Sequence, residues 1–217
     1  MNSQTKILEE RLFEIRETLL ELEYLKKDVK TLIFSEEEHR HETIPESHFF
    51  VRLYHNYLRL FVIDVYKLIG NKEDHNIHKL IEFCKINLKV IKWHDSISIE
   101  KLKLLNDKLY SISVKFEQIQ GLRNKYFAHN DKKKRQFSFK ISLEELWEVL
   151  EGLQSIFAEI NLHFDNNHWL FDIQYTSPGI IQSLSKYKRL RKLTLEEYGK
   201  NKPSIETNRL LSIIRSR

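Results

Sequence analysis

Side chains that can act on a phosphodiester are concentrated between residues 123 and 135. Arg123 is followed by Asn124, and His129 comes six residues after the arginine. A run of four cations follows closely, namely Lys132, Lys133, Lys134 and Arg135. A histidine that titrates near neutral pH can take the proton from an RNA 2′-hydroxyl or give one to the leaving oxygen, while an arginine stabilises the charge that develops at phosphorus. This chemistry requires no metal, so the segment is a candidate site for metal-independent RNA cleavage.

The same segment also has a purely structural explanation. Histidine, lysine and arginine are common in the last turn of a helix, where they interact favourably with the helix dipole and the free carbonyl groups. His129 and the lysines after it would then only finish a helix. The residue types alone leave both explanations open.

Arg123 interrupts an apolar stripe on a helix expected from about residue 98 to about residue 128. The apolar residues before it follow at steps of three and four, as Leu105, Leu109, Ile112, Phe116 and Ile119. Because burying an unpaired guanidinium costs several kcal/mol, Arg123 needs a partner or a pocket. Asp64 is a similar polar interruption in a second expected helix, residues 47–69. We predict a bidentate Asp64–Arg123 ion pair; the alternative is that Asp64 meets solvent at a rim.

The elements that must position these residues are expected to be helices. Apolar residues at helical spacing predict helices at about residues 3–34, 47–69, 74–91 and 98–128, the third with Asp74 as its N-cap. Ser142 and Glu145 form a capping-box pattern at the start of a fifth helix, and Ser177-Pro178 opens a sixth. Four or more long helices with short connections predict an all-α helical bundle. Residues 137–141 and 169–175 alternate apolar and polar side chains, which is typical of a small two-stranded ribbon.

The charge of the chain is unevenly distributed over its 217 residues. The net charge is +5, but residues 178–217 hold ten Lys/Arg and three Glu, so they carry +7 while residues 1–177 carry −2. We therefore predict a helical bundle domain over residues 1–177 and a basic C-terminal helix and tail over residues 178–217. The cations around Tyr187 could follow a phosphate backbone, or they could form a solvated helix face.

Cysteine, histidine and glycine usage excludes several classes of site. The only cysteine, Cys84, excludes an internal disulfide and a four-cysteine zinc site, and it predicts a reducing, cytoplasmic location. The ten histidines show no complete metal-ligand set, and the five glycines are too dispersed for a P-loop or a Rossmann motif. No apolar run is long enough to cross a membrane, and we expect no export signal at the N-terminus. We predict no metal, no cofactor and no membrane contact.

Residues 123–129, Arg-Asn-Lys-Tyr-Phe-Ala-His, resemble the signature of the HEPN superfamily, an arginine, a polar residue, and a histidine after four to six intervening positions. The abortive-infection, AbiU-like branch of this superfamily is resembled by Asn130-Asp131 and by residues 64–69 and 77–81. The resemblance as a whole covers about residues 10–165. The resemblance implies an up-and-down bundle that homodimerises and places two motifs in one cleft. It implies a metal-independent RNA endonuclease of bacterial toxin or abortive-infection (antiphage) defence, for which an antitoxin or regulatory protein could be a partner.

The resemblance also implies roles for individual residues. Arg123 would orient the scissile phosphate, His129 would transfer protons, and Asn124 would position the phosphate or the motif. The expected supporting residues are Asp64, Tyr126 and Asp131, and the expected RNA-binding residues are Lys125, Lys132, Lys133, Lys134 and Arg135. A related branch has tyrosine where this chain has Asp131, so control by AMP addition is not expected. Because some HEPN domains are catalytically silent, the alternative is an RNA-binding or protein-interaction module of the same fold.

Overall fold

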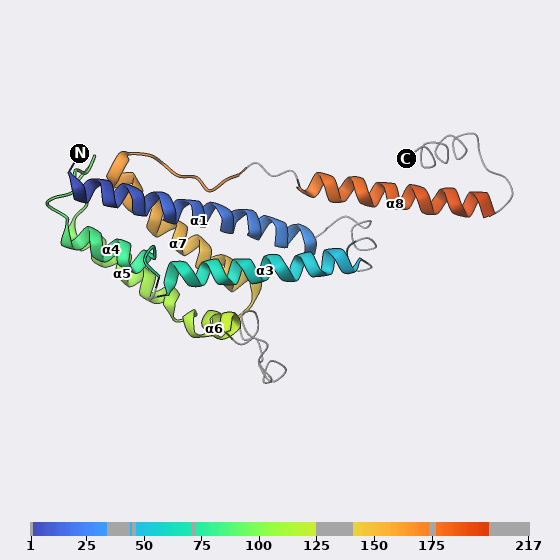
Figure 1. The fold of residues 1–217 in the computed structure, drawn as a ribbon, viewed down its shortest axis with the longest axis horizontal. Coiled ribbons are helices and arrows are strands. Elements are labelled where there is room, and N and C mark those ends of the chain that lie inside the picture. Colours follow the sequence, from blue (N-terminus) through green and yellow to red (C-terminus); the bar gives the residue numbers. More distant parts are fainter. Residues whose placement is uncertain are drawn as a thin grey trace. The chain divides into compact units, whose positions relative to one another are not determined.

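The computed structural model describes residues 2–33, 44, 47–70, 73–124, 141–173 and 177–199, and this part of the chain contains helices and no strands (Figure 1). The helices are α1 (Ser3–Ile33), α3 (His48–Ile69), α4 (Ile77–Ile86), α5 (Ile99–Ser113), α6 (Phe116–Gly121), α7 (Leu143–Asp165) and α8 (Ser177–Gly199). The predicted all-α class is confirmed. Of the predicted ribbon, Ile141 and residues 169–173 form no strand, and residues 137–140 and 174–175 lie outside the described residues.

The chain divides into two compact units. The first comprises residues 1–27 and 56–173, and the second comprises residues 28–55 and 174–217. The helices α4 to α7 therefore belong to the first unit, together with the beginning of α1 and most of α3. The division of the chain into a bundle over residues 1–177 and a tail over residues 178–217 stays a prediction. None of the helices in the described ranges is long and apolar enough to cross a lipid bilayer.

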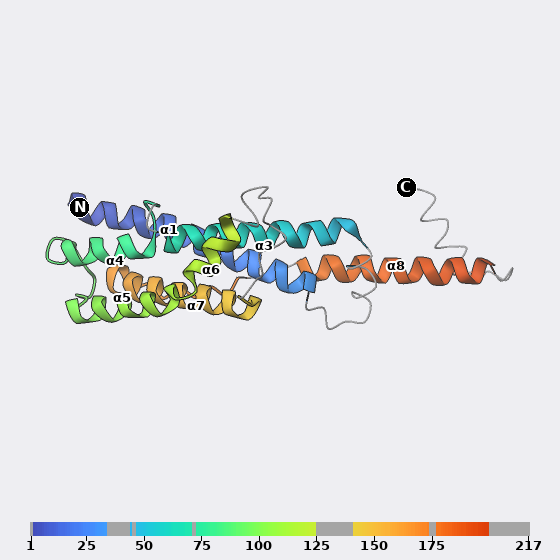
Figure 2. The ribbon, with the colours of Figure 1, turned by 90° about the horizontal axis from the view of Figure 1, so that it is seen from below.

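The apolar stripe of α1 forms one side of the core of the first unit. Its residues are at most 4% exposed, and they are Leu8, Leu12, Ile15, Leu19, Leu22 and Leu25. The helix predicted over residues 3–34 is thus confirmed. Elsewhere in this unit α5 packs against both α4 and α7 (Figure 2). Where α5 and α7 meet, a Cβ added to Gly152 would lie 3.1 Å from Cγ1 of Ile112, so the missing side chain allows a close approach.

The helix α7 begins as its sequence predicts. The Ser142 side chain accepts a hydrogen bond from the Glu145 N–H, at 3.1 Å, and the Glu145 carboxylate accepts one from the Ser142 N–H, at 2.8 Å. This capping box satisfies two N–H groups that have no partner within the helix. At the other end the helix stops at Asn166, whose left-handed backbone conformation (φ 62°) is typical of a helix terminus.

Replacing Ser142 with alanine is expected to lower the free energy of unfolding by about 1 kcal/mol, because the Glu145 N–H loses its acceptor. Ser142→Asp, which keeps an acceptor at the cap, serves as the control and should stay close to wild type. Urea denaturation followed by circular dichroism measures both variants. Equal stability of the alanine and aspartate variants would show that the cap contributes nothing.

Two helix boundaries differ from those predicted. The helix expected from Asp74 begins at Ile77, because the buried Asn76 is the N-cap and accepts the Lys79 N–H at 2.7 Å. Asp74 instead pairs with the Lys79 ammonium, at 3.1 Å. The same helix was expected to reach Ile91 but ends at Ile86.

The helix expected over residues 98–128 is interrupted after Ser113. The hydroxyls of Ser111 and Ser113 donate to the carbonyls of Lys108 and Tyr110, each at 2.7 Å, and thereby compete with the backbone ladder. The chain turns at Val114 and Lys115 before α6 begins. Residues downstream of the turn consequently do not continue the face that α5 presents to the core.

Candidate functional site

The residues Arg123 and Asn124 lie directly after α6, in a short π-helical turn at residues 122–124. Single π turns are rare, and they frequently occur at functional sites. Ile119 is fully buried and Leu122 is 4% exposed, so this turn is anchored in apolar surroundings. Arg123 and Asn124 themselves are only partly buried, which leaves their side chains within reach of a ligand.

The guanidinium of Arg123 has two contacts within the described residues. Its Nη1 donates to Oδ1 of Asn124, at 2.8 Å. Its Cζ lies over the ring of Tyr66, on α3, at 4.8 Å from the ring centroid. Such a cation–π contact stabilises by about 0.5–2 kcal/mol, depending on how far the cation is desolvated. Both contacts orient the guanidinium, and neither partner carries a negative charge that would neutralise it.

The Tyr66 ring also holds the beginning of α6. Its centroid lies 5.4 Å from that of Phe116, with 18° between the ring planes, so the two rings are stacked. Phe116 is the first residue of α6 and Arg123 follows two residues after its end. Tyr66 therefore contacts the chain at both ends of α6, through Phe116 at its start and through Arg123 after its end.

The predicted ion pair between Asp64 and Arg123 is not formed. Asp64 pairs with Lys67 on its own helix, with 2.7 Å between Oδ1 and Nζ, and its side chain is only 16% exposed. Asp64 is partly exposed and its hydrogen bond with the half-exposed Lys67 lies at the surface, which is close to the alternative of a rim residue. The pairing was predicted from one continuous helical period through residue 123, and the turn after Ser113 breaks that period. The ring of Tyr66, two residues after Asp64 on α3, contacts Arg123 instead.

The other predicted site residues lie outside the described part of the chain. They are Lys125, Tyr126, His129, Asp131, Lys132, Lys133, Lys134 and Arg135. Their positions relative to Arg123 stay predictions. Sequence reasoning missed Tyr66 and Phe116 because it sought only a carboxylate for the arginine. Phe116 shares the apolar stripe of Arg123, so its position was an available signal. Tyr66 lies two residues from Asp64, about 200° around the helix, so the face of Asp64 gave no signal for it, although a ring face also stabilises a guanidinium.

A cluster of charges ties the start of α6 to the first turns of α7. Lys115 Nζ lies 2.8 Å from Oε2 of Glu148 and 3.6 Å from Oε1 of Glu145. The hydrogen bond to Glu148 raises the pKa of Lys115, and the backbone N–H of Ser142 lowers the pKa of Glu145. These groups are screened by solvent, so their contribution to stability is small. Their contacts nevertheless connect the beginning of α6 to a capped helix.

The histidines and the cysteine give little support to a metal site. Within the described ranges no group of three or more His, Cys, Asp and Glu side chains could hold a metal ion. Cys84 is fully buried, and desolvation raises the pKa of its thiol to about 12, so it stays protonated at neutral pH. His39 and His41 lie outside the described residues.

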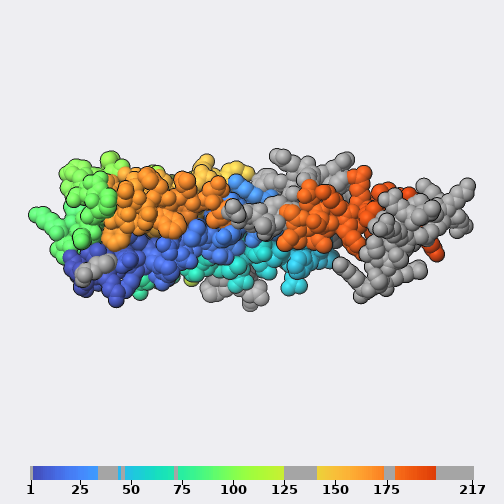
Figure 3. Space-filling view, turned by 90° about the horizontal axis from the view of Figure 1, so that it is seen from above, coloured from blue at the N-terminus to red at the C-terminus, as the bar shows by residue number. Residues whose placement is uncertain are grey.

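A groove of about 370 Å³ lies elsewhere in the first unit, lined by residues 169–172 and by side chains of α1 and α7. The segment after α7 lies beside α1 there (Figure 3). Arg16, on α1, lies over the Trp169 ring at 4.7 Å, and Lys27 donates to the carbonyl of Ile173 at 2.7 Å. These contacts hold the segment after α7 against α1.

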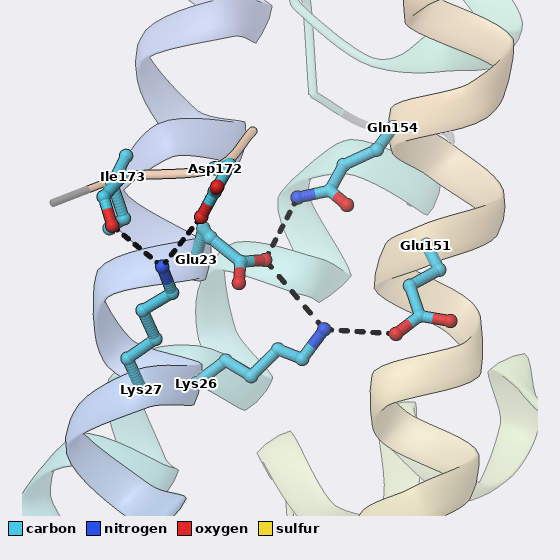
Figure 4. Close-up of polar contacts among 7 residues, drawn as sticks. All are labelled: Glu23, Lys26, Lys27, Glu151, Gln154, Asp172 and Ile173. Carbon is cyan, nitrogen blue, oxygen red and sulfur yellow. Dashed lines mark hydrogen bonds and ion pairs between the residues drawn. The ribbon is translucent and has the colours of Figure 1, made fainter. Parts of the chain in front are cut away.

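A buried charge cluster lines this groove (Figure 4). Glu23 Oε2 accepts from Gln154 Nε2 at 3.1 Å and lies 3.7 Å from Lys26 Nζ, which also pairs with Glu151 at 2.9 Å. The side chains of Glu23 and Lys26 are each 9% exposed. Because both buried charges have partners within the protein, this cluster serves the packing of α1 against α7.

Comparison with known proteins relates most of the chain to one family. A family model described as AbiU2, of HEPN type, matches residues 12–177. No curated protein and no solved structure matches the chain. The matched range includes Tyr66, Phe116, Arg123 and Asn124, and it ends at the first residue of α8.

Proposed function

This chain belongs to the AbiU2 family of HEPN-type abortive-infection proteins, and from that premise we propose that it is a metal-independent RNA endonuclease. Two copies of the chain would share one active site, with Arg123, Asn124 and His129 of each copy facing a common cleft. Cleavage of RNA would make the protein a toxin in antiphage defence, held in check by an antitoxin or another regulatory protein.

One observation carries the proposal. Arg123 is partly buried over the Tyr66 ring, and within the described residues no carboxylate lies within ion-pair distance of it. A purely structural arginine would be neutralised in an intramolecular ion pair, because leaving a buried charge uncompensated costs several kcal/mol. A cation that is oriented without being neutralised is suited to stabilising a developing phosphoryl charge. The contact that keeps Arg123 in place is thus compatible with binding an anionic substrate.

The proposed reaction is an in-line attack of an RNA 2′-oxygen on the adjacent phosphorus. A histidine, His129 of one copy, takes the proton from the 2′-hydroxyl as the new P–O bond forms. The bond from phosphorus to the 5′-oxygen breaks, and that oxygen receives a proton from a second acid, for which His129 of the other copy is the candidate. Arg123 stabilises the negative charge on the two non-bridging oxygens. Lys125 and residues 132–135 would bind the neighbouring phosphates.

The wild-type protein in EDTA tests this proposal. We expect it to cleave single-stranded RNA at a rate that the chelator does not change, and to leave 2′,3′-cyclic phosphate and 5′-hydroxyl ends. Loss of cleavage in EDTA would disprove the metal-independent mechanism. Salt-dependent RNA binding without any cleavage of a varied set of RNAs would favour the non-catalytic module instead. Sedimentation at micromolar concentration tests the shared site separately, since a monomer there would exclude it.

A further inference from the structure

We infer that Tyr66 is a positioning residue that fixes the guanidinium of Arg123 for contact with the phosphate oxygens of RNA. The inference rests on the proposed function of the same site. It adds a residue that lies outside the motif in sequence, 57 positions before Arg123. It also assigns the orientation of the arginine to an aromatic ring.

The Tyr66 ring contacts both Phe116 and Arg123. The ring centroid of Phe116 lies 5.4 Å from that of Tyr66, with 18° between the ring planes, and Cζ of Arg123 lies over the Tyr66 ring at 4.8 Å from its centroid. Phe116 and Arg123 are seven residues apart in one short stretch of chain. A single ring on α3 thus contacts both the start of α6 and the guanidinium after its end.

The Tyr66 ring is itself held in a fixed place. Tyr66 is 8% exposed, and its neighbours Val65 and Leu68 on α3 are at most 1% exposed. Directly after α3, Gly70 leaves room for Tyr66, because a Cβ at that position would lie 2.8 Å from the Tyr66 carbonyl oxygen and 3.2 Å from Cε1 of its ring. A side chain at position 70 would therefore displace both the backbone of Tyr66 and the ring that supports Arg123.

An arginine over an aromatic ring keeps its in-plane N–H groups available. A guanidinium is planar, so its donors point outward from its edge and can meet two phosphate oxygens at once, whereas a ring covers only its face. One N–H of Nη1 is directed to Asn124. The ring and the amide together restrict the rotation of the side chain, which lowers the entropy lost when the transition state forms.

Kinetics of Tyr66 variants test the positioning role. Losing a cation–π contact of 0.5–2 kcal/mol predicts that Tyr66→Leu lowers kcat for RNA cleavage about 2- to 30-fold, with little change in KM. Tyr66→Phe keeps the ring and should retain the wild-type rate. Tyr110→Leu is the matched control, because Tyr110 is 71% exposed on α5 in the same unit. A wild-type kcat in Tyr66→Leu would overturn the inference.

A spectroscopic measurement separates positioning from a loss of folded protein. In wild type and Tyr66→Phe, the ring current should shift the NMR signal of the Arg123 Nε–H, and the signal should move when an uncleavable 2′-deoxy RNA analogue is added. Tyr66→Leu should lose the first shift and reduce the second. Gly70→Ala keeps every ring atom but displaces the ring. It should reduce both the ring-current shift of the Arg123 signal and the response of that signal to the analogue, and it provides a second variant if Tyr66→Leu does not fold.

The two proposals fail in different ways. If the wild-type protein does not cleave RNA but the Arg123 signal responds to the analogue through Tyr66, the endonuclease proposal fails and the positioning role stands. If cleavage occurs and the Arg123 signal is the same in wild type and Tyr66→Leu, the positioning role fails and the endonuclease proposal stands.

Discussion

Replacing Arg123 with alanine is expected to lower kcat for RNA cleavage by about 10²- to 10³-fold, with a smaller change in KM. This is the usual cost of removing one preorganised donor that stabilises charge in a transition state. The residue is partly buried and oriented by Tyr66 and Asn124, so water cannot reproduce its geometry. Initial rates with a labelled RNA in EDTA provide the measurement.

Replacing His129 with alanine is expected to lower kcat for RNA cleavage by about 10²- to 10⁴-fold, because His129 is the proposed proton-transfer residue. The same initial-rate assay measures it.

The control for Arg123 is Arg59→Ala, because Arg59 is an exposed arginine on α3 in the same unit. It removes the same charge from the surface and should change the rate by less than a few-fold at moderate salt. If Arg123→Ala and His129→Ala both cleave RNA as fast as wild type, the motif is only the cationic end of a helix, and the structural explanation is correct.

Replacing Lys26 with methionine is expected to lower the free energy of unfolding by about 3 kcal/mol. Glu23 would then keep its charge in a buried position with only Gln154 as a hydrogen-bond donor, and a stranded buried charge is costly. The methionine has nearly the volume of the lysine stem, so loss of packing contributes little. Urea denaturation of the two proteins measures the difference.

Two further variants decide why Lys26 matters. The double variant Glu23→Leu with Lys26→Met removes both buried charges, so it should recover most of the stability lost in the single variant. Glu151→Gln removes only the exposed partner, whose side chain is 62% exposed, and should cost less than 1 kcal/mol. A double variant that is as unstable as Lys26→Met would contradict the electrostatic explanation.

Local patterns were enough to predict most helices of this protein. The stripe of α1 from Leu8 to Leu25 is buried as its spacing predicts, and the Ser142–Glu145 capping box starts α7. Such features depend on residues within one or two turns of each other, so they can be read from the chain alone. The interruption after Ser113 was missed although its cause is local, since serine hydroxyls compete with the ladder only when their rotamers point back to it.

The sequence by itself determined that this is an all-α protein of the AbiU2 family with an unusual arginine at position 123. Only the tertiary structure decided what that arginine contacts. Periodicity places a residue on a face of its own helix, but it does not say which residue of another helix faces it once the chain turns. Tyr66, and not Asp64, lies against Arg123, which follows the turn at Val114 and Lys115 between α5 and α6.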